Sequence, residues 1–327
     1  MTRFILKRLL LLIPVLIGVT FVVFVILSMA PGDPVLVLLG DGASEEAVAK
    51  MRAELGLDDP LMVRYGNYIL GILHGDFGKS YKTRVSVADE LMSRFPNTLI
   101  LAGCGMVLSI LLGIPLGIIS AKRQGTVLES TLTFSALVAV SMPNFWLGLL
   151  LVLFFVVNLR IPGLPSQGMG AGGVPLFLSL ILPGITLSTG ITATIMRMTR
   201  SSMLETIRQD YISTARAKGL KESQVTKNHM LKNALIPIIT VVGLQFGHLM
   251  GGSMLTETVF SWPGVGRYLM ESIKTKDTPA ILGTVVLISV SFSFVNLLVD
   301  ILYAFVDPRI KSQYKSGLRV RGGGKAA

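Results

Sequence analysis

Cysteine, histidine and charge are all scarce in this sequence of 327 residues. It has one cysteine and three histidines, and charged residues make up only 15% of the chain. The single cysteine, Cys104, excludes an internal disulfide and a cysteine-based metal site. The histidines share no ligand spacing, so no metal site is expected. In an ordinary soluble domain about a quarter of the residues are charged. The low charge of this chain, together with its 51% hydrophobic residues, excludes an ordinary soluble domain.

Motifs for binding a nucleotide or for catalysis are also missing. The stretch LHGDFGKS, Leu73 to Ser80, has leucine where a phosphate-binding loop requires glycine, and no βαβ unit surrounds it. GMGAGG, Gly168 to Gly173, is not a dinucleotide-binding pattern and follows no strand. No Ser/His/Asp set is visible. We therefore expect a chain that is not an enzyme, has no catalytic residues and binds no cofactor. Fuel for active transport would come from a partner or an ion gradient.

Long apolar segments are what the sequence has in place of such motifs. A helix needs about 20 apolar residues to cross a bilayer. Six segments qualify, which predicts an all-α polytopic membrane protein with six transmembrane helices. They are Leu9–Ala30, Leu99–Ala121, Thr131–Leu159, Leu176–Met196, Ala234–Leu255 and Ala280–Phe305.

Two of these segments allow a second interpretation. Leu9–Ala30 resembles a signal peptide, but it is longer than the 7–15 apolar residues typical of one, so we expect an uncleaved helix. Pro143-Asn144 interrupts Thr131–Leu159, which is then either one kinked span or two short ones. Each half is too short to cross, which favours a single tilted helix or a helix preceded by an irregular turn.

The distribution of charge predicts the orientation of the spans. With six spans and both termini in the cytoplasm, lysine and arginine greatly outnumber acids on the inside, whereas acids outnumber them outside. This asymmetry follows the positive-inside rule. It explains the net charge of +11 without a nucleic-acid partner. We expect a multi-pass protein of the cell (inner or plasma) membrane.

The spans divide the chain into four parts. Residues 1–30 hold the N-terminus and first span, and residues 31–97 form a small helical extracytoplasmic insertion. Residues 98–306 form the transmembrane core with a cytoplasmic loop at 198–233, and residues 307–327 are a basic, disordered cytoplasmic tail. Capping and periodicity predict three helices in the insertion, Ser44–Leu55 ended by Gly56, Pro60–Leu73 and Val87–Phe95.

The most polar part of the cytoplasmic loop is DYISTARAKGL, Asp210 to Leu220. Asp210 is a good N-cap and Gly219 a natural left-handed terminator, which predicts a helix of about two turns. A helix this short is marginal in water, so it is expected to dock on something. Small residues (Ala215, Ala217) would permit close approach, and Arg216 and Lys218 would supply cationic donors. The alternative is a solvated, positively charged loop.

A second helix is expected to follow from about Ser223 through Asn233 and to lead directly into the fifth span. Movement of the first helix would then be transmitted to the fifth span.

The loop and several other blocks resemble one family of transport proteins. RMTRSSMLETIRQDYISTARAKGL followed by HMLKNALIPIIT is similar to the signature of permeases in the dipeptide, oligopeptide and nickel subfamily of type I ABC importers. The general signature is EAA-x3-G, and its EAA positions are here Ser213, Thr214 and Ala215. Lys221 stands where relatives often have Ser or Thr. The other matching blocks are MAPGDP (29–34), ELGLDDPL (54–61), GDFGKS (75–80), TETVFSWPGVGR (256–267) and NLLVDILY (296–303).

The resemblance implies the type I ABC importer permease fold, with the short helix as a coupling helix in a cleft of an ATPase subunit. It implies three kinds of partner: a second homologous permease, two ATP-binding cassette ATPases that use ATP and Mg, and an extracytoplasmic substrate-binding protein. The expected coupling contacts are Asp210, Tyr211, Ile212, Thr214, Ala215, Arg216, Ala217, Lys218, Gly219 and Leu220.

Polar and aromatic residues near the spans have two interpretations each. Polar groups in the membrane either form interhelical hydrogen bonds or line the translocation path; the candidates are Asn144, Gln245, His248 and Ser253. The loop after the fifth span is either an interfacial aromatic anchor or, by resemblance, an external gate or binding-protein contact; its residues are Phe260, Trp262, Pro263 and Gly264. For Asp300 we expect a structural ion pair.

The sequence therefore indicates the membrane subunit of an ATP-driven importer of di- or oligopeptides. A nickel or glutathione importer subunit is the alternative within the family. A secondary transporter is the alternative outside it, and it would predict an inverted internal repeat, which is not visible.

Overall fold

The computed structural model describes residues 2–30, 33–40, 42–170 and 173–306, and the regular secondary structure in this part of the chain is helical apart from one isolated β-bridge. The predicted basic tail at 307–327 and the side chain of Asp300 lie outside the described residues. The chain divides into two compact units. The first unit is Met1–Ala102, Leu147–Pro183 and Leu249–Ser293, and the second unit is Gly103–Trp146, Gly184–His248 and Phe294–Ala327.

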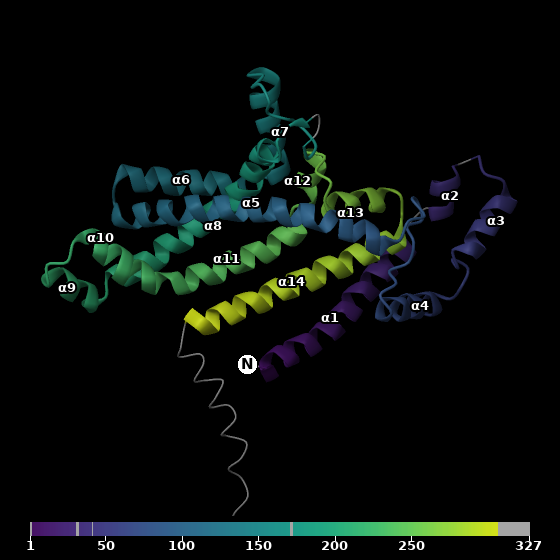
Figure 1. Cartoon of the computed structure of the whole chain (residues 1–327), viewed down its shortest axis with the longest axis horizontal. Coiled ribbons are helices and arrows are strands. Elements are labelled where there is room, and N and C mark those ends of the chain that lie inside the picture. Colours follow the sequence, from purple (N-terminus) through teal and green to yellow (C-terminus); the bar gives the residue numbers. More distant parts are fainter. Residues whose placement is uncertain (1, 31–32, 41, 171–172, 307–327) are drawn as a thin grey trace, which may run out of the picture. The chain divides into compact units, whose positions relative to one another are not determined.

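The helices follow one another in a simple order along the chain (Figure 1). They are α1 (Thr2–Met29), α2 (Pro34–Leu39), α3 (Glu45–Glu54), α4 (Leu61–Leu73), α5 (Val87–Lys122), α6 (Val127–Ser141), α7 (Asn144–Leu151), the π-helix η1 (Val152–Asn158), α8 (Leu176–Ile207), α9 (Asp210–Ala217), α10 (Glu222–Gln224), the π-helix η3 (Val225–Leu231), α11 (Lys232–Gly252), α12 (Met254–Val259), α13 (Val265–Lys274) and α14 (Thr278–Val306).

Five of the described helical segments are long and apolar enough to cross a membrane, and a bent pair makes a sixth candidate. The pair is α6 with α7 and η1, which bend by 102°. The prediction of one tilted helix is therefore wrong for this segment. Met142, the residue before Pro143, has extended backbone angles (φ −86°, ψ 123°) because the proline ring disfavours helix there, and α6 ends.

In the segment between the first two spans, most of the predicted helix ends are confirmed. Ser44 caps α3 by accepting a hydrogen bond from the N–H of Ala47, and Gly56 is left-handed at φ +61°. Pro60 precedes α4. The predicted separate helix Val87–Phe95 is instead the beginning of α5, which runs on through the membrane span. A proline at position 96 removes one backbone donor without ending the helix.

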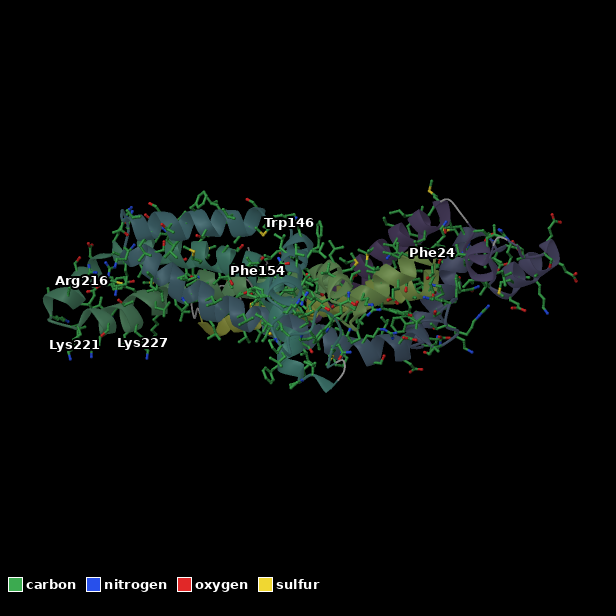
Figure 2. All side chains as sticks on the ribbon, turned by 90° about the horizontal axis from the view of Figure 1, so that it is seen from above. Phe24, Trp146, Phe154, Arg216, Lys221 and Lys227 are labelled. Carbon is green, nitrogen blue, oxygen red and sulfur yellow. The ribbon has the colours of Figure 1, made fainter. Side chains whose placement is uncertain are left out.

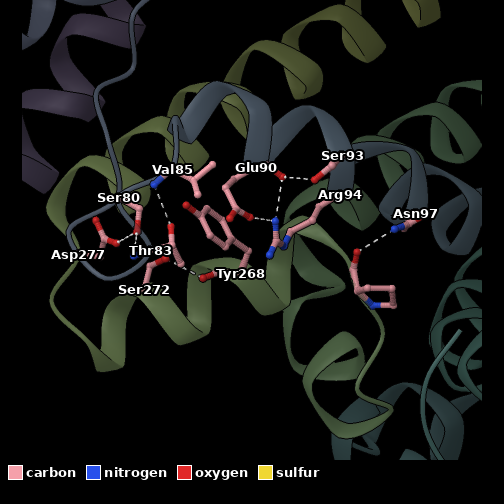
Figure 3. A network of polar contacts seen from close by, with 11 residues as sticks. Ser80, Thr83, Val85, Glu90, Ser93, Arg94, Asn97, Tyr268, Ser272 and Asp277 are labelled. Atoms are coloured by element: carbon pink, nitrogen blue, oxygen red, sulfur yellow. Dashed lines mark hydrogen bonds and ion pairs between the residues drawn. The ribbon is translucent and has the colours of Figure 1, made fainter. Parts of the chain in front are cut away.

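A polar network links the loop before α5 to the corner between α13 and α14 in the first unit (Figure 3). Asp277 is buried and accepts a 2.5 Å hydrogen bond from the hydroxyl of Ser80. Arg94 pairs with Glu90, and its guanidinium carbon lies 4.7 Å from the ring centre of Tyr268. Apolar packing beneath the network joins the same elements, through Val87, Leu91, Val265, Tyr268 and Ala280.

In the second unit, α5, α6 and α8 pack side by side (Figure 1). Glycine permits the closest approach, because a Cβ at Gly117 would lie 2.5 Å from the Cβ of Thr199 and 2.7 Å from the carbonyl oxygen of Met196. Gly113, one turn earlier, faces Ile195 in the same way. Small residues four apart commonly bring membrane helices together. Helix α8 is thereby held along α5 up to the loop that carries α9.

Candidate functional site

The short helix predicted in the polar loop is present as α9, eight residues long. Gly219 has φ +76°, which confirms it as the left-handed residue after the helix. The N-cap position belongs to Gln209, whose side chain makes no capping bond, so the prediction of Asp210 as N-cap is wrong. Asp210 is the first helical residue, where its negative charge is favourable at the positive end of the helix dipole.

One face of α9 is buried against its own chain. Ile212 has no exposed surface and Ala215 is 6% exposed. Both belong to an apolar cluster with residues from α5, α8, η3 and α11; the other buried members are Ala121, Met203, Val225, Met230, Ala234 and Ile238. A helix of two turns is not stable alone. Packing in this cluster gives α9 its stability and ties it to helices that continue into the membrane.

The opposite face of α9 carries small and polar side chains that are all exposed. At 100° per residue, Asp210, Thr214 and Ala217 lie on the side away from Ile212 and Ala215, with Ser213 beside them. We call Asp210, Ser213, Thr214 and Ala217 the outward face. The prediction that Ala215 permits close approach of a partner is therefore corrected, because Ala215 points into the cluster. Ala217 is exposed, and close approach of a partner there stays a prediction.

Polar contacts fix the flanks of α9. Arg216 makes two hydrogen bonds to the carboxylate of Glu222, from Nε at 3.2 Å and from Nη2 at 2.9 Å. The amide nitrogen of Asn233 lies 2.8 Å from the hydroxyl of Tyr211. Arg216 is thus engaged within the chain rather than free for an acidic partner. Lys218 and Leu220 are exposed beside the outward face. Figure 2 shows Arg216, Lys221 and Lys227 near one another, on α9 and the helical segment that follows it.

The predicted second helix is confirmed, and it begins one residue earlier than expected. Helix α10 begins at Glu222, with Lys221 at the N-cap position and without a side-chain capping bond. Ser223 therefore lies inside the first turn and is not the cap. The helical segment passes through η3 into α11 and remains one candidate span from Glu222 to Gly251. This continuity is what a loop that transmits motion to the membrane requires.

The four residues suggested for a translocation path have different environments. In the second unit, Gln245 is half-buried and His248 is exposed on α11, and Asn144 is exposed at the start of α7. A Cβ at Gly190 would lie 3.9 Å from the side-chain oxygen of Asn144. In the first unit, Ser253 is fully buried, and its hydroxyl donates a 3.0 Å hydrogen bond to Glu257.

The loop suggested as an external gate is a packed corner in the first unit. Phe260 is 2% exposed and Trp262 has no exposed surface. The indole N–H of Trp262 donates to the carbonyl of Asn97 at 2.9 Å, and the amide of Asn97 donates to the carbonyl of Pro263 at 2.9 Å. Gly264 is buried as well. The two aromatic side chains therefore pack inside the first unit, and the role of this loop as an external gate or binding-protein contact stays a prediction.

Sequence reasoning missed Glu257, the carboxylate at the centre of this corner. Its side chain has no exposed surface. It accepts hydrogen bonds from the hydroxyls of Thr98 (2.9 Å) and Ser253, and from the N–H of Arg267 (3.0 Å). Burial raises the pKa of Glu257, and this effect outweighs the hydrogen bonds that favour the charged form. An acid among aromatic and glycine residues in TETVFSWPGVG was the available signal.

Long apolar helices, with a short, half-buried helix on a loop between two of them, define a polytopic membrane protein. The chain belongs to the binding-protein-dependent transport system inner membrane component family, which matches residues 113–312. The N-terminal component of the same systems matches residues 1–102.

Relatives match nearly the whole chain. It is 41% identical to the dipeptide transport system permease protein DppB of Escherichia coli K12, covering 95% of this chain and 99% of the relative. It is 43% identical to a probable peptide ABC transporter permease of Sinorhizobium fredii, covering 94% and 99%. It is 41% identical to the glutathione transport system permease protein GsiC of Salmonella typhimurium LT2, covering 95% and 99%.

A solved structure shares the fold. A chain of the MetNI methionine ABC transporter in an inward-facing conformation superimposes with a TM-score of 0.56 at 20% identity, covering 67% of this chain and 96% of that one. The chain is therefore a type I ABC importer permease, a multi-pass subunit of the inner membrane and a transport component. Permeases of this class work with a partner permease, ATPase subunits and a binding protein.

Proposed function

We propose that this chain, together with one homologous permease, forms the translocation path of an ATP-driven peptide importer. Two ATPase subunits would supply the energy, and a binding protein would deliver the peptide. Support for the substrate comes from relatives whose names specify dipeptides or peptides, at 41% and 43% identity over nearly the whole chain.

The observation that carries the coupling role is the two-sided nature of α9. Its inward face, Ile212 and Ala215, is rigidly packed on α8, η3 and α11. Its outward face is small, polar and uncovered within this chain. The outward face docks in a cleft of an ATPase subunit. Closure of the two ATPases displaces α9, and the displacement passes through the buried cluster into α8 and α11.

Charge supports the orientation. The loop at 198–233 lies in the cytoplasm together with both chain termini, because its excess of lysine and arginine favours the inside. A topology reporter inserted after Arg216 should therefore be active only as a cytoplasmic fusion. A reporter that reads extracytoplasmic at this position would contradict the six-span arrangement.

The chain itself binds no cofactor, and ATP and Mg act on the partner subunits. Purified alone, it should hydrolyse no ATP, and hydrolysis should appear when the ATPase subunits are added. We assign three polar residues to the path, because His248 and Asn144 are exposed and Gln245 is only half-buried.

The decisive experiment replaces Ala217 by glutamate on the outward face. A buried, unpaired carboxylate at a docking surface costs several kcal/mol, so ATP-driven uptake of a labelled dipeptide into proteoliposomes should be lost. The matched control is Ala49→Glu on α3, another exposed alanine in a helix. Normal uptake by Ala217→Glu, or equal losses in both variants, would refute the coupling role of this face.

Glutathione is the second candidate substrate, because the glutathione permease is as similar to this chain as the dipeptide permease of E. coli. Uptake of labelled dipeptide, longer peptide and glutathione by the same reconstituted importer distinguishes them. The substrate whose uptake saturates at the lowest concentration is the one for which the system is built.

A further inference from the structure

Helix α4 has two different faces. Tyr65, Tyr68 and Ile72 lie on one side, and the other side is an apolar stripe. The stripe residues are Met62 (65% exposed), Val63 (48%), Leu70 (57%) and Leu73 (75%), with Gly66 between them. We call these five residues the α4 stripe. Nothing in the described part of the chain covers the α4 stripe.

The contacts of Tyr65 place α4 beside the middle of the first span. Its hydroxyl donates to the carbonyl of Ile17 at 2.8 Å and lies 3.0 Å from the hydroxyl of Thr20. Its ring packs against the rings of Phe21 and Phe24 at centroid distances of 5.2 and 5.5 Å. The apolar span of α1 is Leu10–Met29, so these contacts fall near its centre.

Helix geometry converts this position into a depth. At about 1.5 Å per residue, Phe24 lies ~8 Å and Ile17 ~18 Å from the end of the span at Met29. The hydrocarbon layer is about 30 Å thick. Tyr65 therefore lies well below the surface of the leaflet into which α1 ends, and α4 is not a helix of the aqueous phase.

Two polar side chains of α4, Tyr65 and Arg64, have contacts that suit this depth, whereas the buried hydroxyl of Tyr68 has no hydrogen-bond partner among the described residues. The hydroxyl of Tyr65 is satisfied by α1, which a polar group in hydrocarbon requires. The only charged residue of the helix, Arg64, points away from the α4 stripe, and its guanidinium carbon lies 5.5 Å from the ring centre of Phe24. Asn67 lies at the edge of the stripe.

We propose that the α4 stripe is a lipid-contact surface, with α4 inserted beside α1 among the acyl chains of the leaflet where α1 ends. Helix α1 exposes apolar side chains of its own, among them Val22 and Ile26. Amphipathic helices with one apolar face bind membranes in this way. Insertion of α4 would hold the neighbouring helices α2 and α3 at a set height relative to the bilayer.

Spin-label accessibility tests this placement in the assembled importer in lipid nanodiscs. Cys104 is replaced by alanine, and one cysteine is introduced by Leu70→Cys or Met62→Cys on the stripe. Ala49→Cys on exposed α3 is the matched aqueous control. Collisions with molecular oxygen report lipid, and collisions with a water-soluble nickel chelate report water.

We expect labels at 62 and 70 to collide several-fold more with oxygen, relative to nickel, than the label at 49. A ratio equal to that of the control would show that α4 is in water and overturn the proposal. Shielding from both reagents would show that another protein covers the stripe and would overturn it as well. The two stripe positions provide separate tests if one variant fails to assemble.

Discussion

Replacing Gly117 by alanine should loosen the contact between α5 and α8. The added Cβ would lie 2.5 Å from the Cβ of Thr199 and 2.7 Å from the carbonyl oxygen of Met196. The carbonyl belongs to the backbone of α8 and cannot rotate away. The two helices must therefore separate, and overpacking of this kind costs about 1–3 kcal/mol.

A second glycine of α5 isolates this cost. Alanine favours a helix over glycine by about 1 kcal/mol, and this gain applies to any glycine in the helix. At Gly103, an added Cβ meets nothing within 4 Å. Gly103→Ala therefore shows the gain alone, and Gly117→Ala shows the gain together with the clash. We expect Gly117→Ala to be less stable than Gly103→Ala by about 1–3 kcal/mol.

Unfolding of the purified chain in mixed micelles, followed by tryptophan fluorescence, measures the difference. If Gly117→Ala proves at least as stable as Gly103→Ala, the close approach of α5 and α8 is refuted. Uptake by the assembled importer is a second readout, because α8 leads from this contact to α9.

Three further predictions concern the two units separately. Burial raises the pKa of Glu257 above its ordinary 4.5. The free energy of unfolding should therefore fall as the pH rises from 4.5 through the raised pKa. In thermal unfolding at a series of pH values, Glu257→Gln should make this pH dependence weaker. Arg216→Ala should cost at most about 1 kcal/mol, and less in high salt, because both side chains of the pair with Glu222 are nearly half-exposed; a larger, salt-independent loss in denaturant titrations would argue against a surface pair. Trp262→Ala should cost about 3–5 kcal/mol, since the indole is fully buried, and unchanged protease resistance of the corner would contradict this.

Local signals predicted the ends of several elements well. Ser44, Gly56 and Gly219 act as the capping rules require, because a helix end depends on a few neighbouring backbone groups. The same rules misplaced the beginning of α9, because they predicted Asp210 as the N-cap, whereas Gln209 has that position. Packing of Ile212 and Ala215 in the cluster sets where α9 begins, and the helix forms without a side-chain cap.

Exposure was the property that the sequence predicted least well. Ala215 and Ala217 are identical residues two positions apart, yet one is buried and the other exposed. Trp262 and Phe260 are residue types that often anchor a protein at the membrane surface, but both are buried in the corner around Glu257. Only the partners of a side chain decide which way it faces, and those partners are distant in sequence.

By itself, the sequence determined that the chain is a helical membrane protein, where its spans lie and that α9 is too short to stand alone. Apolar length, charge distribution and capping residues are local properties, so they can be read along the chain. Tertiary structure alone decided which face of α9 remains free and that α4 lies beside the middle of α1. Each of these depends on contacts between residues far apart in sequence, such as Tyr65 with Ile17, which no local pattern encodes.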